Sequence, residues 1–267
     1  MVGTGAERDR TVPLDVQDLS VRYGDRWAVR QLSFRVNPGE IYGLLGSNGA
    51  GKSSTIKAVV GLVRPASGVV RVFGQSPETE GVATKRSIGY VPETPYLFDA
   101  LSPREFFEFV ASVRKLPSLE TTARALNYAK AFQVDAEYER PIGVISSGVR
   151  QKVLLIAALL HEPPLLILDE PFNNLDPRAV RLLKDLLHRY AREARRGVLL
   201  STHTLELAEQ LCDRVGILDQ GVLRGEGTLA GLRAELASSD ATLESIFLRL
   251  TAEEDGVRDA LELLRGP

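Results

Sequence analysis

A glycine-rich run in the first quarter of the chain has the residue types and spacing needed to hold phosphate groups. Its members are Gly46, Ser47, Asn48, Gly49, Ala50, Gly51, Lys52, Ser53 and Ser54. Residues 46–53 fit the pattern G-x-x-x-x-G-K-[ST], whose glycines let the backbone wrap a triphosphate with its N–H groups pointing inward. Lys52 can reach the β- and γ-phosphates, and the Ser53 hydroxyl can ligate Mg²⁺. The pattern therefore predicts binding of a nucleoside triphosphate.

The residues on either side of this loop predict the elements that would position it. Residues 40–45 are mostly apolar and predict a short buried strand, whereas residues 53–62 are compatible with a helix that begins at about Lys52. The partly positive N-terminus of such a helix would add to the anion site. A Gly-rich turn without function is the alternative, but the order strand, loop and helix favours a nucleotide site.

Two adjacent carboxylates, Asp169 and Glu170, follow a second apolar run at residues 165–168. A carboxylate at the end of a strand buried on both faces is costly to desolvate, and a metal ion would compensate it. In nucleoside-triphosphate hydrolases Asp169 would hold Mg²⁺, and Glu170 would accept a proton from the attacking water as general base. The alternative is a strand that merely ends in acidic residues.

The order of these motifs makes residues 14–230 resemble the nucleotide-binding subunit of an ATP-binding cassette (ABC) transporter. Residues 46–53 match the Walker A motif of that family, and residues 165–170 match its Walker B motif. Residues 174–176 resemble the D-loop that follows. A kinase or GTPase shares only the phosphate loop, so the ordered set favours the ABC family.

The resemblance assigns roles to single residues. It implies that Lys52, Glu170 and His203 are catalytic, with His203 sensing the γ-phosphate. Tyr23 matches the aromatic residue that stacks on adenine, and Asp176 is the D-loop residue near the nucleotide. The alternatives are a surface histidine and a tyrosine that only packs at the end of its strand.

The family's signature motif, Leu-Ser-Gly-Gly-Gln, is altered at residues 145–149. Ser146 and Gly148 match the positions that contact the γ-phosphate of ATP bound to the partner subunit, whereas Ser147 and Val149 depart from the consensus. Gly148 still permits close approach of the backbone, and Ser146 still supplies a hydroxyl at the start of a helix. We expect a working but weaker composite site.

Glu93 is a second departure, because most of the family carries Gln in this loop, where it approaches Mg²⁺. A Glu adds negative charge near Asp169 and Glu170 and increases the repulsion when no metal is present. Glu at this position is familiar in cassettes of ABC-2 type exporters, and residues 243–251 also resemble that subgroup. The alternative for residues 243–251 is a plain amphipathic helix.

We expect an α/β fold, a P-loop NTPase of the ABC ATPase type. Its core sheet should be mostly parallel, with an N-terminal antiparallel β subdomain and an inserted helical subdomain. The expected parts are a flexible tail (1–13), an ABC ATPase domain (14–230) with the helical subdomain at about 94–160, and a C-terminal helical extension (231–267). Strands are predicted at 14–23, 28–36, 40–45, 69–73, 165–169, 198–201 and 215–219.

The composition narrows the possible partners. A net charge of -2 and a pI near 6.0 give no electrostatic reason to expect nucleic acid as a partner. Cys212 is the only cysteine, so no internal disulfide can form and a reducing cytosol fits. Residues 1–13 lack the apolar stretch of a secretory signal, and no run approaches the ~18 apolar residues that span a bilayer.

The resemblance implies an ATPase that powers a separate transmembrane permease, with ATP and Mg²⁺ as cofactors. Two such subunits, identical or different, would sandwich two ATP molecules, and the chain would sit in the cytoplasm at the inner face of the cell membrane. Export is favoured over import. The alternatives are a soluble ABC ATPase that acts in translation or DNA maintenance, and a regulatory module without catalysis.

Overall fold

The first layer of the protein is a small antiparallel sheet that precedes and follows the phosphate loop. The computed structural model describes residues 11–193, 195–235 and 241–251. Within them the small sheet has the strand order β2-β1-β4. Its strands are β1 (Leu14–Tyr23), β2 (Arg26–Val36) and β4 (Ser67–Arg71). β4 begins and ends two residues before the predicted strand at 69–73, and β2 begins two residues before the predicted one.

The second layer is a larger sheet with the order β5-β6-β7-β3-β8-β9. Its strands are β3 (Ile41–Leu45), β5 (Ile88–Val91), β6 (Leu165–Asp169), β7 (Gly197–Thr202), β8 (Arg214–Asp219) and β9 (Val222–Gly227). All neighbours are parallel except β8 and β9. The central strands β3, β6 and β7 are buried throughout, which is why they appear in the sequence as continuous apolar runs.

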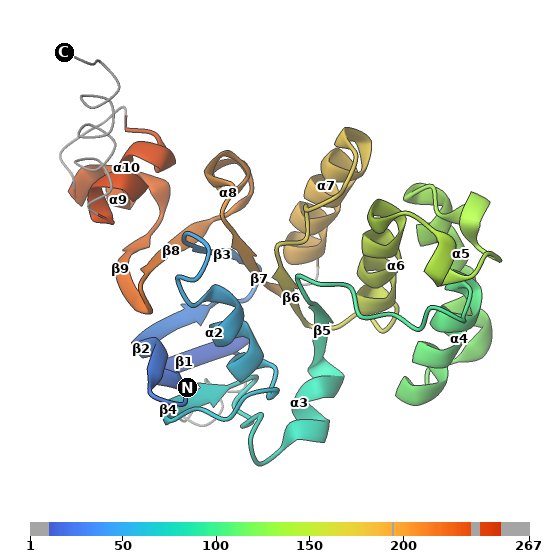
Figure 1. Ribbon diagram of the computed structural model, residues 1–267, viewed down its shortest axis with the longest axis horizontal. Helices are drawn as coiled ribbons and strands as arrows, with labels where there is room; N and C mark the ends of the chain where they lie inside the picture. The colour runs from blue at the N-terminus through green and yellow to red at the C-terminus, as the bar shows by residue number, and fades with distance from the viewer. Residues whose placement is uncertain (1–10, 194, 236–240, 252–267) are drawn as a thin grey trace, which may run out of the picture.

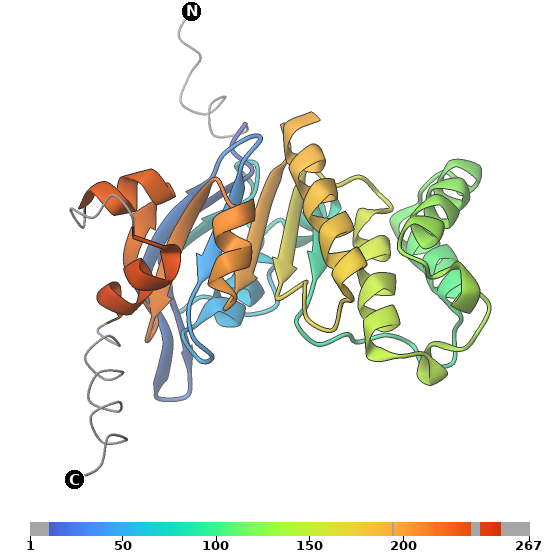
Figure 2. The ribbon, with the colours of Figure 1, turned by 90° about the horizontal axis from the view of Figure 1, so that it is seen from above.

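Helices cover the sheets and form a separate group beside them (Figure 1). They are α2 (Lys52–Val59), α3 (Gly81–Ser87), α4 (Pro103–Arg114), α5 (Ser118–Ala131), α6 (Ser147–Leu159), α7 (Pro177–Glu193), α8 (Leu205–Leu211), α9 (Leu229–Glu235) and α10 (Leu243–Leu250), with short 3₁₀ turns at Asp135–Glu137 and Ile142–Val144. Figure 2 shows α4 and α5 beyond one edge of the sheet and α9 and α10 beyond the other. None of the helices in the described ranges is long and apolar enough to cross a membrane.

The helix signals in the sequence have clear physical counterparts. The Ser102-Pro103 pair predicts the start of a helix, and α4 begins there, with Pro103 at its first position and a capping box formed by Ser102 and Glu105. The helical spacing of Leu183, Leu187, Tyr190 and Ala194 predicts one apolar face on a helix that begins near Pro177. In α7 the first three of these residues are buried, and Ala194 lies outside the described residues. The helical spacing of the apolar residues 106, 107, 110 and 113 misleads at its end, because Val113 is 66% exposed although Phe106 and Phe107 are buried in α4.

Four described elements are not predicted from the sequence: α3, α8, β5 and β9. β5 is four residues long and β9 is only half-buried, so neither carries a strong apolar period. The predicted tail at 1–13 falls mostly outside the described residues. So does the end of the predicted C-terminal extension, because nothing is described beyond residue 251.

Candidate functional site

The predicted catalytic motifs meet at the carboxyl ends of three neighbouring strands. β3 leads into the phosphate loop, β6 ends at Asp169, and β7 is followed directly by His203. These strands lie side by side in the order β6-β7-β3 and run parallel. In open α/β sheets, the carboxyl ends of parallel strands form the crevice where ligands bind.

The phosphate loop has a shape that requires glycine. Gly51 has φ +112°, and a Cβ there would lie 2.4 Å from the carbonyl oxygen of Ala28. A Cβ on Gly46 would lie 2.4 Å from the carbonyl oxygen of Leu218. Both approaches are far too short for a real Cβ, so other residues at these positions would push the loop away from β2 and β8.

Lys52, the first residue of α2, is buried and directed into the loop. Its Nζ donates to the carbonyl oxygens of Gly46 at 2.8 Å and Ser47 at 3.2 Å, and lies 3.5 Å from Oε1 of Glu170. Burial of an ammonium group is tolerated here because acceptors surround it on several sides. The phosphate loop and the end of β6 therefore share one charged cluster.

Glu170 sits in a strained backbone position at the centre of this cluster. Its φ is +50°, which is uncommon for a residue with a side chain. The conformation is held because its N–H donates to the carbonyl oxygen of Ser201 at 3.1 Å. Its Oε1 lies 2.9 Å from Nδ1 of His203, whose side chain is half-exposed, while that of Glu170 is buried. Strain of this kind is common at functional sites.

Asp169 lies behind Glu170 in an acidic environment. Burial raises the pKa of Asp169, the hydroxyls of Ser201 and Ser53 oppose the rise by hydrogen bonding, and the charge of Glu93 adds to it. The Ser53 hydroxyl also lies 3.5 Å from Oε2 of Glu93. Burial, Asp169 and Glu93 together raise the pKa of Tyr90 to about 12. A cation would relieve the repulsion between these carboxylates.

The oxygen donors of Ser53, Asp169 and Glu93 fit a hard divalent cation such as Mg²⁺. Among the described residues no group of three or more His, Cys, Asp or Glu side chains is arranged as a metal site. Mg²⁺ in nucleotide sites commonly takes few protein ligands and fills its other positions with water and substrate phosphates.

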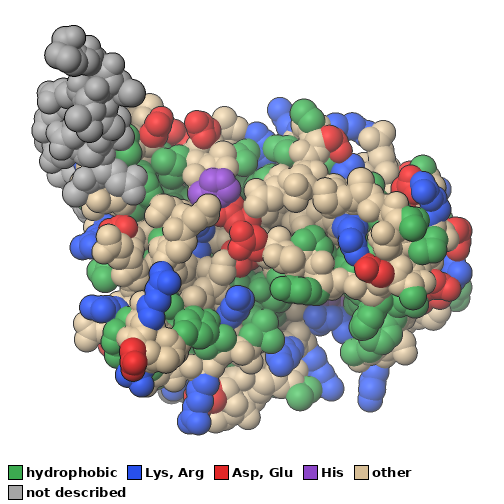
Figure 3. Space-filling model, in the orientation of Figure 1, with side chains coloured by type: hydrophobic (Ala, Val, Ile, Leu, Met, Phe, Trp, Pro, Cys, Tyr) green, Lys and Arg blue, Asp and Glu red, His purple; other side chains and the backbone are tan. Residues whose placement is uncertain are grey.

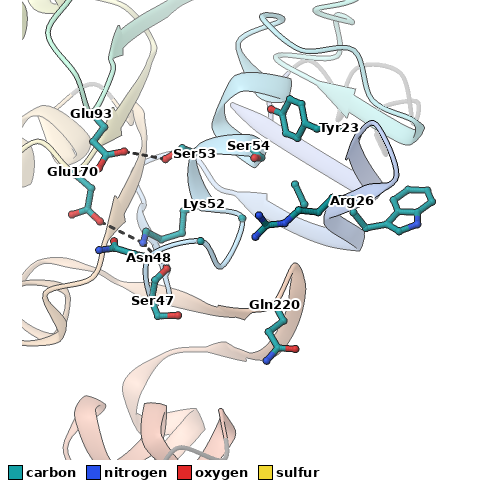
Figure 4. Close-up of a pocket in the computed structure, with 14 residues that line it drawn as sticks. Tyr23, Arg26, Ser47, Asn48, Lys52, Ser53, Ser54, Glu93, Glu170 and Gln220 are labelled. Atoms are coloured by element: carbon teal, nitrogen blue, oxygen red, sulfur yellow. Dashed lines mark hydrogen bonds and ion pairs between the residues drawn. The ribbon is translucent and has the colours of Figure 1, made fainter.

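A polar cavity of about 730 Å³ opens over the loop (Figure 4). The predicted residues that line it are Tyr23, Ser47, Asn48, Gly49, Gly51, Lys52, Ser53, Ser54, Glu93 and Glu170. Arg26, Trp27, Ala28 and Gln220 also line it and are not predicted from the sequence. Gly46 and Ala50 shape the loop behind the lining. In Figure 3 one histidine and a group of acidic side chains lie together at the centre of this face.

Comparison with known proteins identifies the protein family to which this chain belongs. The family model described as ABC transporter matches residues 29–173. The ABC-type transporter ATP-binding protein EcsA of Bacillus subtilis (strain 168) is 36% identical over 246 residues, which cover 91% of this chain and 98% of that protein. The chain belongs to the ABC transporter family.

Further similarities extend this assignment. Nod factor export ATP-binding protein I of Burkholderia orbicola (strain AU 1054) is 33% identical over 218 residues, covering 80% of this chain and 70% of that protein. A solved structure described as "Structure of ATP binding subunit of ABC transporter" matches with a TM-score of 0.85 and 35% identity, over 89% of this chain and 99% of that chain. The predicted family and the α/β fold class are confirmed, and this ABC subunit binds and hydrolyses ATP.

The altered signature motif of this ABC subunit lies outside the cavity. Ser146 caps α6 by accepting from the Val149 N–H at 3.4 Å, and its side chain is exposed. A Cβ on Gly148 would lie 2.6 Å from the carbonyl oxygen of Asn174, so α6 touches the D-loop at a glycine. The altered position Val149 therefore still donates to the helix cap.

Asp176, the last residue of the D-loop, holds two helices together. Its Oδ2 accepts from Lys152 of α6 at 2.6 Å, and its Oδ1 accepts from the Ala179 N–H of α7 at 2.9 Å. The hydrogen bond from Lys152, followed by that from Ala179, lowers the pKa of Asp176. Ser146, Gly148 and Asp176 are thus not among the residues that line the cavity, and their predicted nucleotide contacts remain a prediction.

Proposed function

We propose that ATP binds in the cavity with its adenine on Tyr23 and its β- and γ-phosphates in the phosphate loop. The observation that carries the proposal is the convergence of Lys52, Glu170 and His203. Oε1 of Glu170 lies 3.5 Å from Lys52 and 2.9 Å from His203, and both Lys52 and Glu170 line the cavity. Tyr23 is 47% exposed at the other end of the same cavity, where its ring is free to stack on a base.

In this proposal Glu170 is the general base. It accepts a proton from water as the water oxygen bonds to the γ-phosphorus and the bond to the bridging oxygen breaks, which yields ADP and phosphate. Lys52 exchanges its contact with Glu170 for one with the γ-phosphate, and that exchange frees the carboxylate. His203 then holds Glu170 and senses the phosphate. Ser53, Asp169 and Glu93 would hold Mg²⁺, which supplies neutralisation of phosphate charge when bound.

The second half of each site comes from another copy or a related subunit. Ser146 and Ser147 are exposed at the N-terminus of α6, a helix of 13 residues whose free N–H groups suit a phosphate. Because these residues are not part of the cavity lining, we place Ser146, Gly148 and Asp176 against ATP held by the partner subunit. ATP would then favour the closed pair, and hydrolysis would release it.

A groove between the helical group and the sheet offers a surface for the permease. It encloses about 350 Å³, and its lining is mostly apolar. Leu62, Phe109 and Val113 line it and are 60%, 45% and 66% exposed, while Lys85 and Arg114 add positive charge. We place a cytoplasmic segment of a membrane-embedded permease here, which would hold the subunit at the inner face of the cell membrane. Glu93 and the likeness to a protein named for Nod factor export favour export.

The function is tested by Glu170→Gln. Loss of the general base should lower ATP turnover at least about 100-fold while ATP binding is retained, because the amide cannot take the proton. The measurement combines phosphate release with light scattering, which should detect an ATP-dependent dimer. The matched control is Glu193→Gln, an exposed carboxylate at the end of α7. Turnover close to that of the control would remove Glu170 from the proposed role.

A further inference from the structure

Arg26, the first residue of β2, is a cationic residue of the cavity that the proposed mechanism leaves unused. It lies directly opposite Tyr23 in the antiparallel β1–β2 pair, across the turn that begins at Gly24. Directly opposite residues of such a pair place their side chains on the same face of the sheet. Arg26 therefore lies beside the ring on which we place adenine.

The start of β2 is held firmly against the phosphate loop. A Cβ on Gly51 would lie 2.4 Å from the Ala28 carbonyl oxygen, and a Cβ on Gly221 would lie 2.7 Å from the same atom. The Gly221 N–H donates to the carbonyl oxygen of Ala50 at 2.9 Å. These contacts join β2, the loop and the β8–β9 turn, so the backbone of Arg26 keeps its position relative to the phosphate site.

The Arg26 guanidinium forms no ion pair with any carboxylate in the part of the chain that the structure describes. In Figure 4 its side chain points from the hairpin toward the phosphate loop, with Tyr23 on one side and Gln220 on the other. An arginine in a polar cavity without an acidic partner is free to pair with an anionic ligand.

We propose that Arg26 binds the α-phosphate of the nucleotide. The inference rests on the proposed orientation, with the base on Tyr23 and the β- and γ-phosphates at Lys52. In that orientation the α-phosphate lies between the two ends of the cavity, where Arg26 reaches in. A planar guanidinium donates two parallel hydrogen bonds to phosphate oxygens, and a lysine at this place would act only as a point charge. Arg26 thus selects nucleotides over shorter phosphates.

The chain carries its own reporter for the test, because its single tryptophan, Trp27, lines the cavity. Trp27 fluorescence is titrated with ATP, ADP and pyrophosphate in EDTA, which prevents hydrolysis. Arg26→Ala should weaken ATP and ADP by the same factor, about tenfold, since both carry an α-phosphate. Pyrophosphate binding should be unchanged. Arg26→Lys should weaken ATP and ADP binding less, by about threefold, because lysine keeps the charge but not the paired hydrogen bonds.

The matched control is Arg30→Ala, which removes the same charge from the same strand at an exposed position outside the cavity. Unchanged ATP and ADP affinities in Arg26→Ala would overturn the inference, as would a loss confined to ATP, which would indicate a γ-phosphate contact. Tyr23→Ala separates the two proposals. If only Tyr23→Ala weakens ATP binding, the proposed stacking of adenine on Tyr23 is supported and the proposed α-phosphate contact of Arg26 is contradicted. If only Arg26→Ala weakens ATP binding, the α-phosphate contact is supported and the proposed stacking on Tyr23 is contradicted.

Discussion

Charged side chains hold one another in place at this site. Lys52 is enclosed by two carbonyl oxygens and by Glu170, and Glu170 is shared between Lys52 and His203. Removing one partner would leave a buried charge uncompensated, which costs more than the interaction itself contributes. Substitutions at Lys52 are therefore expected to disturb Glu170 as well as phosphate binding.

His161, which lies outside the nucleotide site, makes the unfolding free energy depend on pH. Its Nε2 lies 3.0 Å from the carbonyl oxygen of Ile88, and its Nδ1 is buried without a partner among the described residues. Burial, with a smaller contribution from Arg114, lowers the pKa of His161 from 6.5 to about 4. The unfolded chain takes up a proton near pH 6.5 that the folded chain refuses until about pH 4, so stability falls as pH falls through this window.

His161→Gln should remove that dependence. The unfolding free energy of the parent protein should fall relative to the variant by about 1 to 2 kcal/mol between pH 7 and pH 4.5, since solvent screening reduces the full effect. Urea denaturation at several pH values gives this difference. His188→Gln in α7 controls for the loss of a histidine. If the unfolding free energies of the parent and of His161→Gln change with pH in parallel, His161 is not the cause of the pH dependence.

At the scale of elements, α6 is the link between the signature motif and the D-loop. It is nearly all buried from Gln151 to Leu159, so it belongs to the core as much as to the interface. Gly148 touches the carbonyl oxygen of Asn174, and Lys152 pairs with Asp176 one turn later. We therefore expect a change in the D-loop to move the exposed end of α6 through these contacts.

Gly148→Ala tests this link. The added Cβ would lie 2.6 Å from a backbone oxygen that cannot easily move, so α6 must shift away from the D-loop. We expect a loss of about 1–3 kcal/mol in unfolding free energy together with slower ATP turnover. Gly81→Ala is the control, because a Cβ there meets nothing within 4 Å. ATP affinity of the monomer, measured by Trp27 fluorescence, should be unchanged, and a loss there would place Gly148 in the chain's own cavity.

At the scale of the whole molecule, the cavity and the signature motif lie in different parts of one chain. The cavity is built from the N-terminal sheet and the strand ends of the core, whereas Ser146 belongs to the helical group. In the proposed arrangement, the exposed N-terminus of another copy's α6 would complete the site over an ATP molecule in the cavity. That arrangement would make a pair of subunits the working unit.

Ser146→Ala in a Glu170→Gln background measures that pairing. Light scattering should show that the ATP-dependent dimer is lost or weakened at least about tenfold, since a phosphate contact across the interface is removed. Ser102→Ala is matched in chemistry, because Ser102 also caps a helix, accepting from the Glu105 N–H at 3.2 Å, but caps α4. Equal dimerisation of both variants would contradict the proposal that Ser146 contacts ATP held by the partner subunit.

Short motifs and periods in the sequence predict much of this protein. The phosphate loop, the buried strand before Asp169 and the amphipathic face of α7 are local patterns, and local backbone chemistry dictates them. Family and fold class follow from their order. The short strand β5 and the half-buried strand β9 escape prediction because their places in the sheet come from their neighbours.

Tertiary structure decided how side chains from distant parts of the sequence come into contact at this site. The convergence of Lys52, Glu170 and His203 depends on the strand order β6-β7-β3, which no local pattern specifies. The same holds for Arg26, an ordinary surface arginine in the sequence until pairing with β1 sets it beside Tyr23. The sequence by itself determined the chemistry available at each position, because residue type and local spacing are properties of the sequence. The fold decided which of those groups meet, because long-range packing brings distant segments together.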